Sequence, residues 1–200
     1  MNIVMEFLYF FFTVALIENI VFTRGLGTSK AFRFAGDKRQ LFIYTVLLVV
    51  LLVPSSIISY FAEKLLSDLH QSTKNVIIPV ISLLIVSILY FILSILISFI
   101  KKSNIKEELR TLLPSTVYCY ITLGTLFLAS RQTLVLYQRI ALVLGSAAGF
   151  LLATFLMSLS MPYLESDKIP RVFRGIPIKI LFIGLLSLAF YGLSGHELSF

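Results

Sequence analysis

Six apolar stretches, each long enough to cross a lipid bilayer, dominate this sequence. A membrane-spanning helix needs about 20 consecutive apolar residues, whereas a membrane-spanning strand needs only about 9–11. Because lipid offers the backbone no hydrogen bonds, stretches of this length are expected to form helices. The predicted fold is therefore an all-α integral membrane protein with six transmembrane helices. The six stretches are Ile3–Phe22, Leu41–Ala62, Val76–Ile100, Thr111–Ser130, Ile140–Tyr163 and Ile178–Gly195.

The composition indicates the same class of protein. Hydrophobic residues make up 58% of the chain and charged residues only 14%, whereas about a quarter of the residues in a soluble domain are charged. Too little polar surface remains to cover a globule in water. The single cysteine, Cys119, excludes an intrachain disulfide framework or a zinc ribbon. We therefore expect one membrane domain, residues 1–200, with lipid around it.

The basic residues alternate between the connections that join these stretches. Thirteen of the 17 Lys and Arg residues lie in the connections 23–40, 101–110 and 164–179, and four lie in the other two. Loops rich in Lys and Arg remain on the cytoplasmic side of a membrane. We therefore expect both termini on the outer face. The alternation also argues against a nucleic-acid-binding patch, because the charges follow the predicted topology.

Polar residues and glycine interrupt the first and fourth stretches. Glu18 and Asn19 lie within the first stretch, and Cys119 and Gly124 lie within the fourth. Interrupted helices at corresponding places in two halves of a membrane protein indicate a binding site between them. We therefore expect both of these helices to be broken.

Three spans in each half place the two halves upside down relative to each other. The predicted inverted repeats cover about residues 1–100 and 101–200. Each half also has a glycine that follows a leucine after the polar interruption, at Gly27 and at Gly124. These two glycines are candidate site positions.

Two residues within the spans could carry chemistry. Glu18, beside Asn19, lies several residues inside the first span, where an ionisable group costs about 2.5–3.5 kcal/mol on insertion scales. It forms an ion or proton site or a cap at the helix break, or else it faces a partner helix or Arg24. Glu6 is expected to reach the outer interface. Cys119 is a ligand or a packing residue, since a buried cysteine usually behaves as a small hydrophobic side chain.

Small residues recur at four-residue spacing in the fifth stretch, at Gly145 and Gly149. This spacing lets the backbone of another helix approach closely. The second helix belongs either to the same chain or to a partner subunit.

The C-terminal part of the chain resembles one family of membrane proteins. The most specific segments are Phe-Arg-Gly at 173–175 and Leu-Ala-Phe-x-Gly-x-Ser-Gly at 188–195. The supporting matches are Ser146–Phe150, Cys119, Gly124, Asn19, Leu26 and Gly27. On these residues the chain is similar to the Rnf/Nqr membrane subunits. That family includes the A subunit of the Rnf electron-transport complex and the E subunit of the sodium-translocating NADH:quinone oxidoreductase.

This resemblance implies six spans in two inverted repeats, in the cytoplasmic membrane of a prokaryote. Members of the family pair with a sister subunit of opposite orientation, and further subunits complete a redox complex that transports sodium ions or protons. Each sister supplies one cysteine from each of two broken helices, and the pair holds a 2Fe–2S cluster. Cys119 matches one of these positions. Flavin and nicotinamide sites would belong to the further subunits.

The chain departs from the family pattern at three positions. Glu18 replaces the first of two asparagines, Ser29 replaces the first-half cysteine, and Tyr118 replaces the asparagine before the second-half cysteine. Half of the expected ligands are therefore missing, and Ser29 is the positional candidate for a ligand beside Cys119.

Three functions follow from these observations. The first is a membrane subunit of an Rnf/Nqr-type ion-translocating electron-transport complex with a degenerate iron–sulfur site. The second is a structural or transport subunit of the same fold without a cluster. The third is a six-span substrate-binding subunit of a vitamin transporter, against which the C-terminal motifs argue. No glycine-rich phosphate loop or nucleophile–base pair is present to predict a catalytic site in this chain.

Overall fold

The computed structural model describes residues 2–66, 70–101, 103–131 and 134–193, and within these ranges the regular structure is entirely helical. α1 runs directly into a π-helical turn, η1, and a short 3-10 turn, η2, precedes α9. The elements are α1 Ile3–Phe12, η1 Thr13–Ile17, α2 Ile20–Arg24, α3 Thr28–Phe34, α4 Lys38–Leu65, α5 Gln71–Ser98, α6 Ser103–Val117, α7 Tyr120–Arg131, α8 Leu136–Leu164, η2 Arg171–Phe173 and α9 Ile176–Leu193.

Three helices in the described ranges are long and apolar enough to cross a membrane. They are α4, the Val76–Ser98 part of α5, and α8. The bent pair Ile105–Val117 and Tyr120–Arg131 makes a fourth if it forms one crossing. Ile3–Ile17 and Ile176–Gly192 are shorter apolar helices. An all-α, multi-pass membrane protein is therefore confirmed, and by length the described helices account for three to four crossings.

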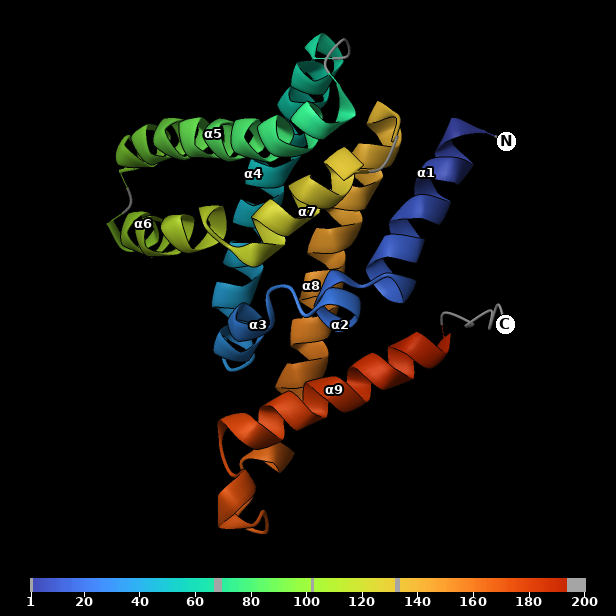
Figure 1. The fold of residues 1–200 in the computed structure, drawn as a ribbon. Helices are drawn as coiled ribbons and strands as arrows, with labels where there is room; N and C mark the ends of the chain where they lie inside the picture. Colours follow the sequence, from blue (N-terminus) through green and yellow to red (C-terminus); the bar gives the residue numbers. More distant parts are fainter. Residues whose placement is uncertain (1, 67–69, 102, 132–133, 194–200) are drawn as a thin grey trace, which may run out of the picture.

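α4 and α8 form the centre of the molecule (Figure 1). α4 begins where the Asp37 carboxylate accepts hydrogen bonds from the backbone N–H groups of Arg39 and Gln40, each at 3.0 Å. Such a cap satisfies donors that the first turn leaves without intrahelical partners. Tyr44 and Phe150 then meet in the buried core between the two helices, with ring centroids 5.4 Å apart.

The remaining helices pack around this central pair. α1 and η1 lie on α8, α5 lies on α4, and α9 contacts α2 and η1 (Figure 1). The Gly145 and Gly149 face of α8 receives α1 and η1: a Cβ atom at Gly145 would lie 2.9 Å from the Phe11 carbonyl oxygen, and one at Gly149 would lie 3.1 Å from that of Ala15. The close helix approach that this spacing predicts is therefore made within the chain.

Both helices that the sequence predicts to be broken are interrupted in the structure. The first ends at Ile17, leaves helical geometry at Glu18 and resumes as α2 at Ile20. The second stops at Val117 and resumes as α7 at Tyr120, with a bend of 44°.

Candidate functional site

The segments that follow the two helix breaks pack against each other through two glycines, Gly27 in the turn between α2 and α3 and Gly124 in α7. A Cβ atom at Gly27 would lie 2.3 Å from side-chain atoms of Ile121, and one at Gly124 would lie 2.5 Å from the side chain of Leu26. Each half of the chain therefore supplies an apolar side chain that occupies the space over the glycine of the other half. Gly27 also has φ +84°, which L side chains rarely adopt. Glycine is required there for space and for backbone geometry.

Asn19 holds the first break together. Its side chain is fully buried, and its Nδ2 donates hydrogen bonds to the carbonyl oxygens of Ala15 at 3.0 Å and Gly149 at 2.8 Å. Its Oδ1 accepts a hydrogen bond from the N–H of Val21 at 3.0 Å, so Asn19 is also the N-cap of α2. One amide thus joins η1, α2 and α8. The capping role at this break belongs to Asn19, since Glu18 beside it is exposed.

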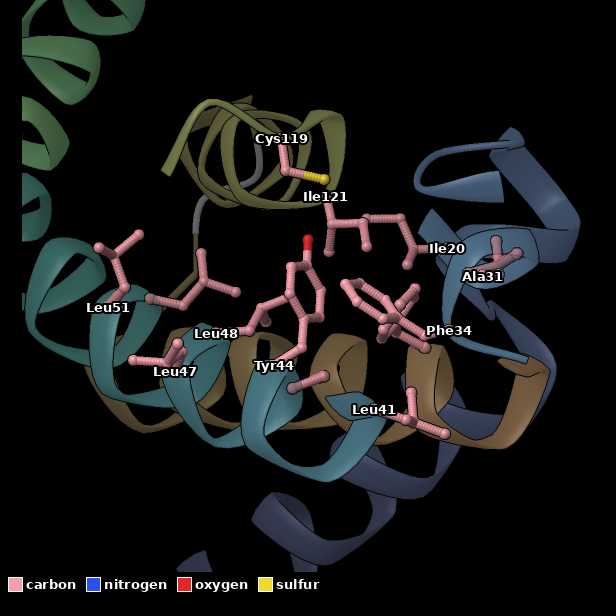
Figure 2. Close-up of a cluster of buried hydrophobic side chains, with 14 of the residues drawn as sticks. Ile20, Ala31, Phe34, Leu41, Tyr44, Leu47, Leu48, Leu51, Cys119 and Ile121 are labelled. Carbon is pink, nitrogen blue, oxygen red and sulfur yellow. The ribbon is translucent and has the colours of Figure 1, made fainter. Parts of the chain in front are cut away.

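Cys119 lies at the second break and is only 3% exposed. Figure 2 shows it above the Tyr44 ring, whose hydroxyl points toward the segment that carries Cys119 and Ile121. Thr122 stabilises this break, because its hydroxyl donates a hydrogen bond to the Thr116 carbonyl oxygen at 2.6 Å. The thiol is therefore a member of the hydrophobic core of this chain.

Ser29 is not buried as Cys119 is. It lies in the first turn of α3 and is exposed, while its neighbour Lys30 donates a hydrogen bond from Nζ to the Ser115 hydroxyl oxygen at 3.1 Å. Lys30 therefore links α3 to α6 and adds a further contact between the two halves. Ser29 and Cys119 do not share one environment, although their segments approach each other through Gly27 and Ile121.

The side chains present do not fit a conventional iron–sulfur cluster. Such a cluster is held by four cysteine thiolates, and this chain has one cysteine. In the described parts of the chain, no three His, Cys, Asp or Glu side chains gather as they would around a metal ion. A serine oxygen is a harder ligand than a thiolate and suits iron–sulfur chemistry less well.

Glu18 borders a hollow of about 530 Å³ at the first break. The hollow lies between this break and α9, and Thr23, Ser187 and Tyr191 also line it. The structure places no hydrogen bond or ion pair on the Glu18 carboxylate within the described ranges, so the contact with Arg24 that the sequence left open is not made there.

Glu6 has a partner within the chain, and its expected position at the outer interface stays a prediction. It accepts a hydrogen bond from the hydroxyl of Tyr137 on α8. A residue 131 positions away in the chain thus binds this carboxylate, so local sequence carries no signal of the pairing.

Sequence reasoning also missed a buried ion pair between α4 and α8. Arg139 contacts Glu63 with both terminal nitrogens, the Nη1–Oε1 distance being 3.0 Å, and its side chain is only 4% exposed. The guanidinium lies over the Tyr60 ring, 5.2 Å from its centroid. The charge pattern assigned Arg139 to a connection, although α8 begins three residues earlier, at Leu136. The position of Arg139 directly before an apolar stretch was the sequence feature that could have placed it in the helix.

The fold and the site together define a multi-pass, all-helical membrane protein in which two broken helices interlock. The family described as Rnf-Nqr subunit, membrane protein, matches residues 7–196, and the chain belongs to this family. The resemblance noted from the C-terminal motifs is thereby confirmed.

Several relatives are the A subunits of ion-translocating complexes. The A subunit of the Na(+)-translocating ferredoxin:NAD(+) oxidoreductase complex of Acetobacterium woodii is 26% identical, over 97% of this chain and 100% of that protein. The A subunit of the ion-translocating oxidoreductase complex of Glaesserella parasuis is 24% identical, over 95% and 97%. The corresponding protein of Syntrophotalea carbinolica is 33% identical over 48% of this chain and 51% of its own length. These matches argue against the vitamin-transporter alternative.

Proposed function

We propose that this chain is a membrane subunit of an Rnf/Nqr-type ion-translocating electron-transport complex. The family match over residues 7–196 carries this proposal, and relatives that cover nearly the whole chain are named as the A subunits of such complexes. Flavin and nicotinamide chemistry is assigned to other subunits of the complex. This chain contributes a membrane domain whose broken helices lie at its centre.

The proposed architecture has six crossings in two inverted repeats, about 1–100 and 101–200. The reciprocal packing of Leu26 on Gly124 and of Ile121 on Gly27 supports this arrangement, because a two-fold relation between halves produces such paired contacts. The charge bias of the connections supports both termini outside the cytoplasmic membrane of a prokaryote. A sister subunit of opposite orientation would cover polar backbone at the breaks, which lipid cannot satisfy.

The iron–sulfur site is proposed to be degenerate, without a four-thiolate cluster. A sister with two cysteines would bring the total to three, because Cys119 is the only cysteine here. The Cys119 side chain is also covered by residues of its own chain, whereas a ligand shared with a sister must reach the subunit surface. Ser29 is exposed but offers a hard oxygen. These residues favour a subunit that serves assembly and transport.

The test is purification of the intact complex through a tag on this subunit. Iron and acid-labile sulfide are then measured, with paramagnetic resonance after reduction. We expect a sister subunit to co-purify, and we expect no 2Fe–2S signal that responds to Cys119→Ala. The matched variant is Ser29→Cys, which supplies the missing thiol without changing side-chain size greatly. A full-occupancy 2Fe–2S signal that disappears in Cys119→Ala would contradict a degenerate site, and a chain that purifies alone in mild detergent would contradict the proposed membership of a complex.

A further inference from the structure

Glu18 places a carboxylate at the break of the first apolar helix. The helix from Ile3 to Ile17 is continuous and rises roughly 20 Å at 1.5 Å per residue. In the proposed topology, with the start of this helix at the outer face, Glu18 would lie inside a hydrocarbon core about 30 Å thick. Its carboxylate receives no hydrogen bond and no ion pair from the described residues. A carboxylate at this depth is costly to ionise and marks a functional site unless it is compensated.

The hollow beside Glu18 supplies oxygen atoms and space. Its volume is about 530 Å³, and its walls include the hydroxyl-bearing residues Thr23, Ser187 and Tyr191. The Thr23 hydroxyl donates its hydrogen to the Asn19 carbonyl oxygen at 2.8 Å, which leaves lone pairs on the Thr23 oxygen. Gly184 on the α9 wall has no atom within 4 Å of where its Cβ would be, so this wall is open.

The helix break adds a favourable electrostatic field. The last turn of a helix leaves carbonyl oxygens without intrahelical donors and carries partial negative charge, which stabilises nearby cations. η1 ends at Ile17, directly before Glu18. Asn19 fixes this end in place through its hydrogen bonds to Ala15 and Gly149. In transporters, the C-terminal ends of such interrupted helices coordinate sodium ions or protons.

We propose that Glu18 is the anionic ligand of a sodium site in this hollow, with the Thr23 and Ser187 hydroxyl oxygens as further ligands. One carboxylate balances the charge of one monovalent cation, whereas a divalent ion would leave a net positive charge in the hollow. The second wall belongs to α9, so binding also holds α9 against the broken first helix. The site deepens the proposed function and rests on it, since an ion-translocating complex needs ion-binding groups within the membrane.

The test is labelling of the purified complex with dicyclohexylcarbodiimide, which modifies protonated carboxyl groups in apolar surroundings. Peptide mass spectrometry quantifies the label on each residue. Without sodium we expect Glu18 to be labelled, and added NaCl should suppress this labelling in a saturable way that KCl does not reproduce. Glu6 is the matched control on the same helix, because it is bound to Tyr137 and does not border the hollow. Its labelling should not depend on sodium.

Two variants distinguish loss of sodium binding in the hollow from a general effect on the complex. Ser187→Ala should raise the NaCl concentration for half-protection of Glu18 by about tenfold, as for the loss of one ligand to a charged group. Ser160→Ala, on α8 and outside the hollow, should leave it unchanged. Equal protection by KCl, sodium-independent labelling, or no labelling of Glu18 in sodium-free buffer would each overturn the site. These results leave the proposed membership of a complex intact, because that proposal fails only if the chain purifies without partners.

Discussion

Replacing Asn19 with alanine tests whether one buried amide holds the broken first helix against α8. The change removes hydrogen bonds to the carbonyl oxygens of Ala15 and Gly149 and the bond received from the Val21 N–H. The Ala15 carbonyl and the Val21 N–H would then lose this partner away from water, whereas the Gly149 carbonyl keeps the hydrogen bond of its own helix, α8. An unpaired buried polar group costs about 1–3 kcal/mol, and an N-cap is worth about 0.5–2 kcal/mol. We therefore expect Asn19→Ala to lower the free energy of unfolding by about 2–5 kcal/mol.

The assay uses the cysteine of the core as the reporter. Cys119 is 3% exposed, so a maleimide reaches it only when the core opens, and peptide mass spectrometry assigns the label to this chain within the complex. For a chain of about 200 residues, 1 kcal/mol shifts the unfolding midpoint by about 2–4 °C. Asn19→Ala should therefore lower the temperature of half-labelling by roughly 4–20 °C.

Two further variants control this experiment. Asn2 precedes α1, is exposed and makes no side-chain cap, so Asn2→Ala should leave the midpoint unchanged. Asn19→Asp should be no more stable than Asn19→Ala, because a carboxylate would face the carbonyl oxygens of Ala15 and Gly149. The reasoning is refuted if Asn19→Ala and Asn2→Ala give the same half-labelling temperature.

The other predictions concern packing, charge and topology. Gly149→Leu should prevent η1 from packing on α8 and reduce the yield of folded complex in size-exclusion chromatography, whereas Gly192→Leu, whose side chain would meet open space, should not. Glu63→Ala should cost about 3–5 kcal/mol in the maleimide assay by leaving Arg139 unpaired in the core; adding Arg139→Met should recover part of this loss, and no recovery would show that the ion pair is not the cause. A reporter that is active only in the cytoplasm, joined after Phe200, should give no signal if both termini lie outside, and a strong signal would rule that topology out.

The helical class and the positions of the breaks could be predicted from local sequence. Apolar length alone distinguishes helices from strands in lipid. Asn19 and Cys119 interrupt apolar stretches, and the structure leaves helical geometry at or beside each of them. Six crossings, the inverted repeat and the outer termini remain predictions that rest on apolar length, on charge and on the family.

Contacts between distant segments could not be predicted in the same way. Gly149 was identified as a packing position, but whether its partner lay in the same chain depends on how η1 rotates against α8. The Arg139–Glu63 pair depends on the relative register of two long helices, which hydropathy does not encode. The exposure of Ser29 follows from the direction in which α3 leaves Gly27, a glycine with positive φ.

The contacts between the two halves have a consequence for how the chain is made. When the first half leaves the ribosome, Ile121, which packs over Gly27, and the Gly149 carbonyl, which binds Asn19, have not yet been synthesised. Asn19 therefore enters the membrane with only its local hydrogen bonds to Ala15 and from Val21, and its bond to Gly149 forms after α8 has been made. The packing of the N-terminal helices is therefore incomplete during synthesis. Quality-control proteases would encounter the N-terminal half in this incompletely packed state. Folding of the N-terminal half is therefore completed only after the second half has been inserted.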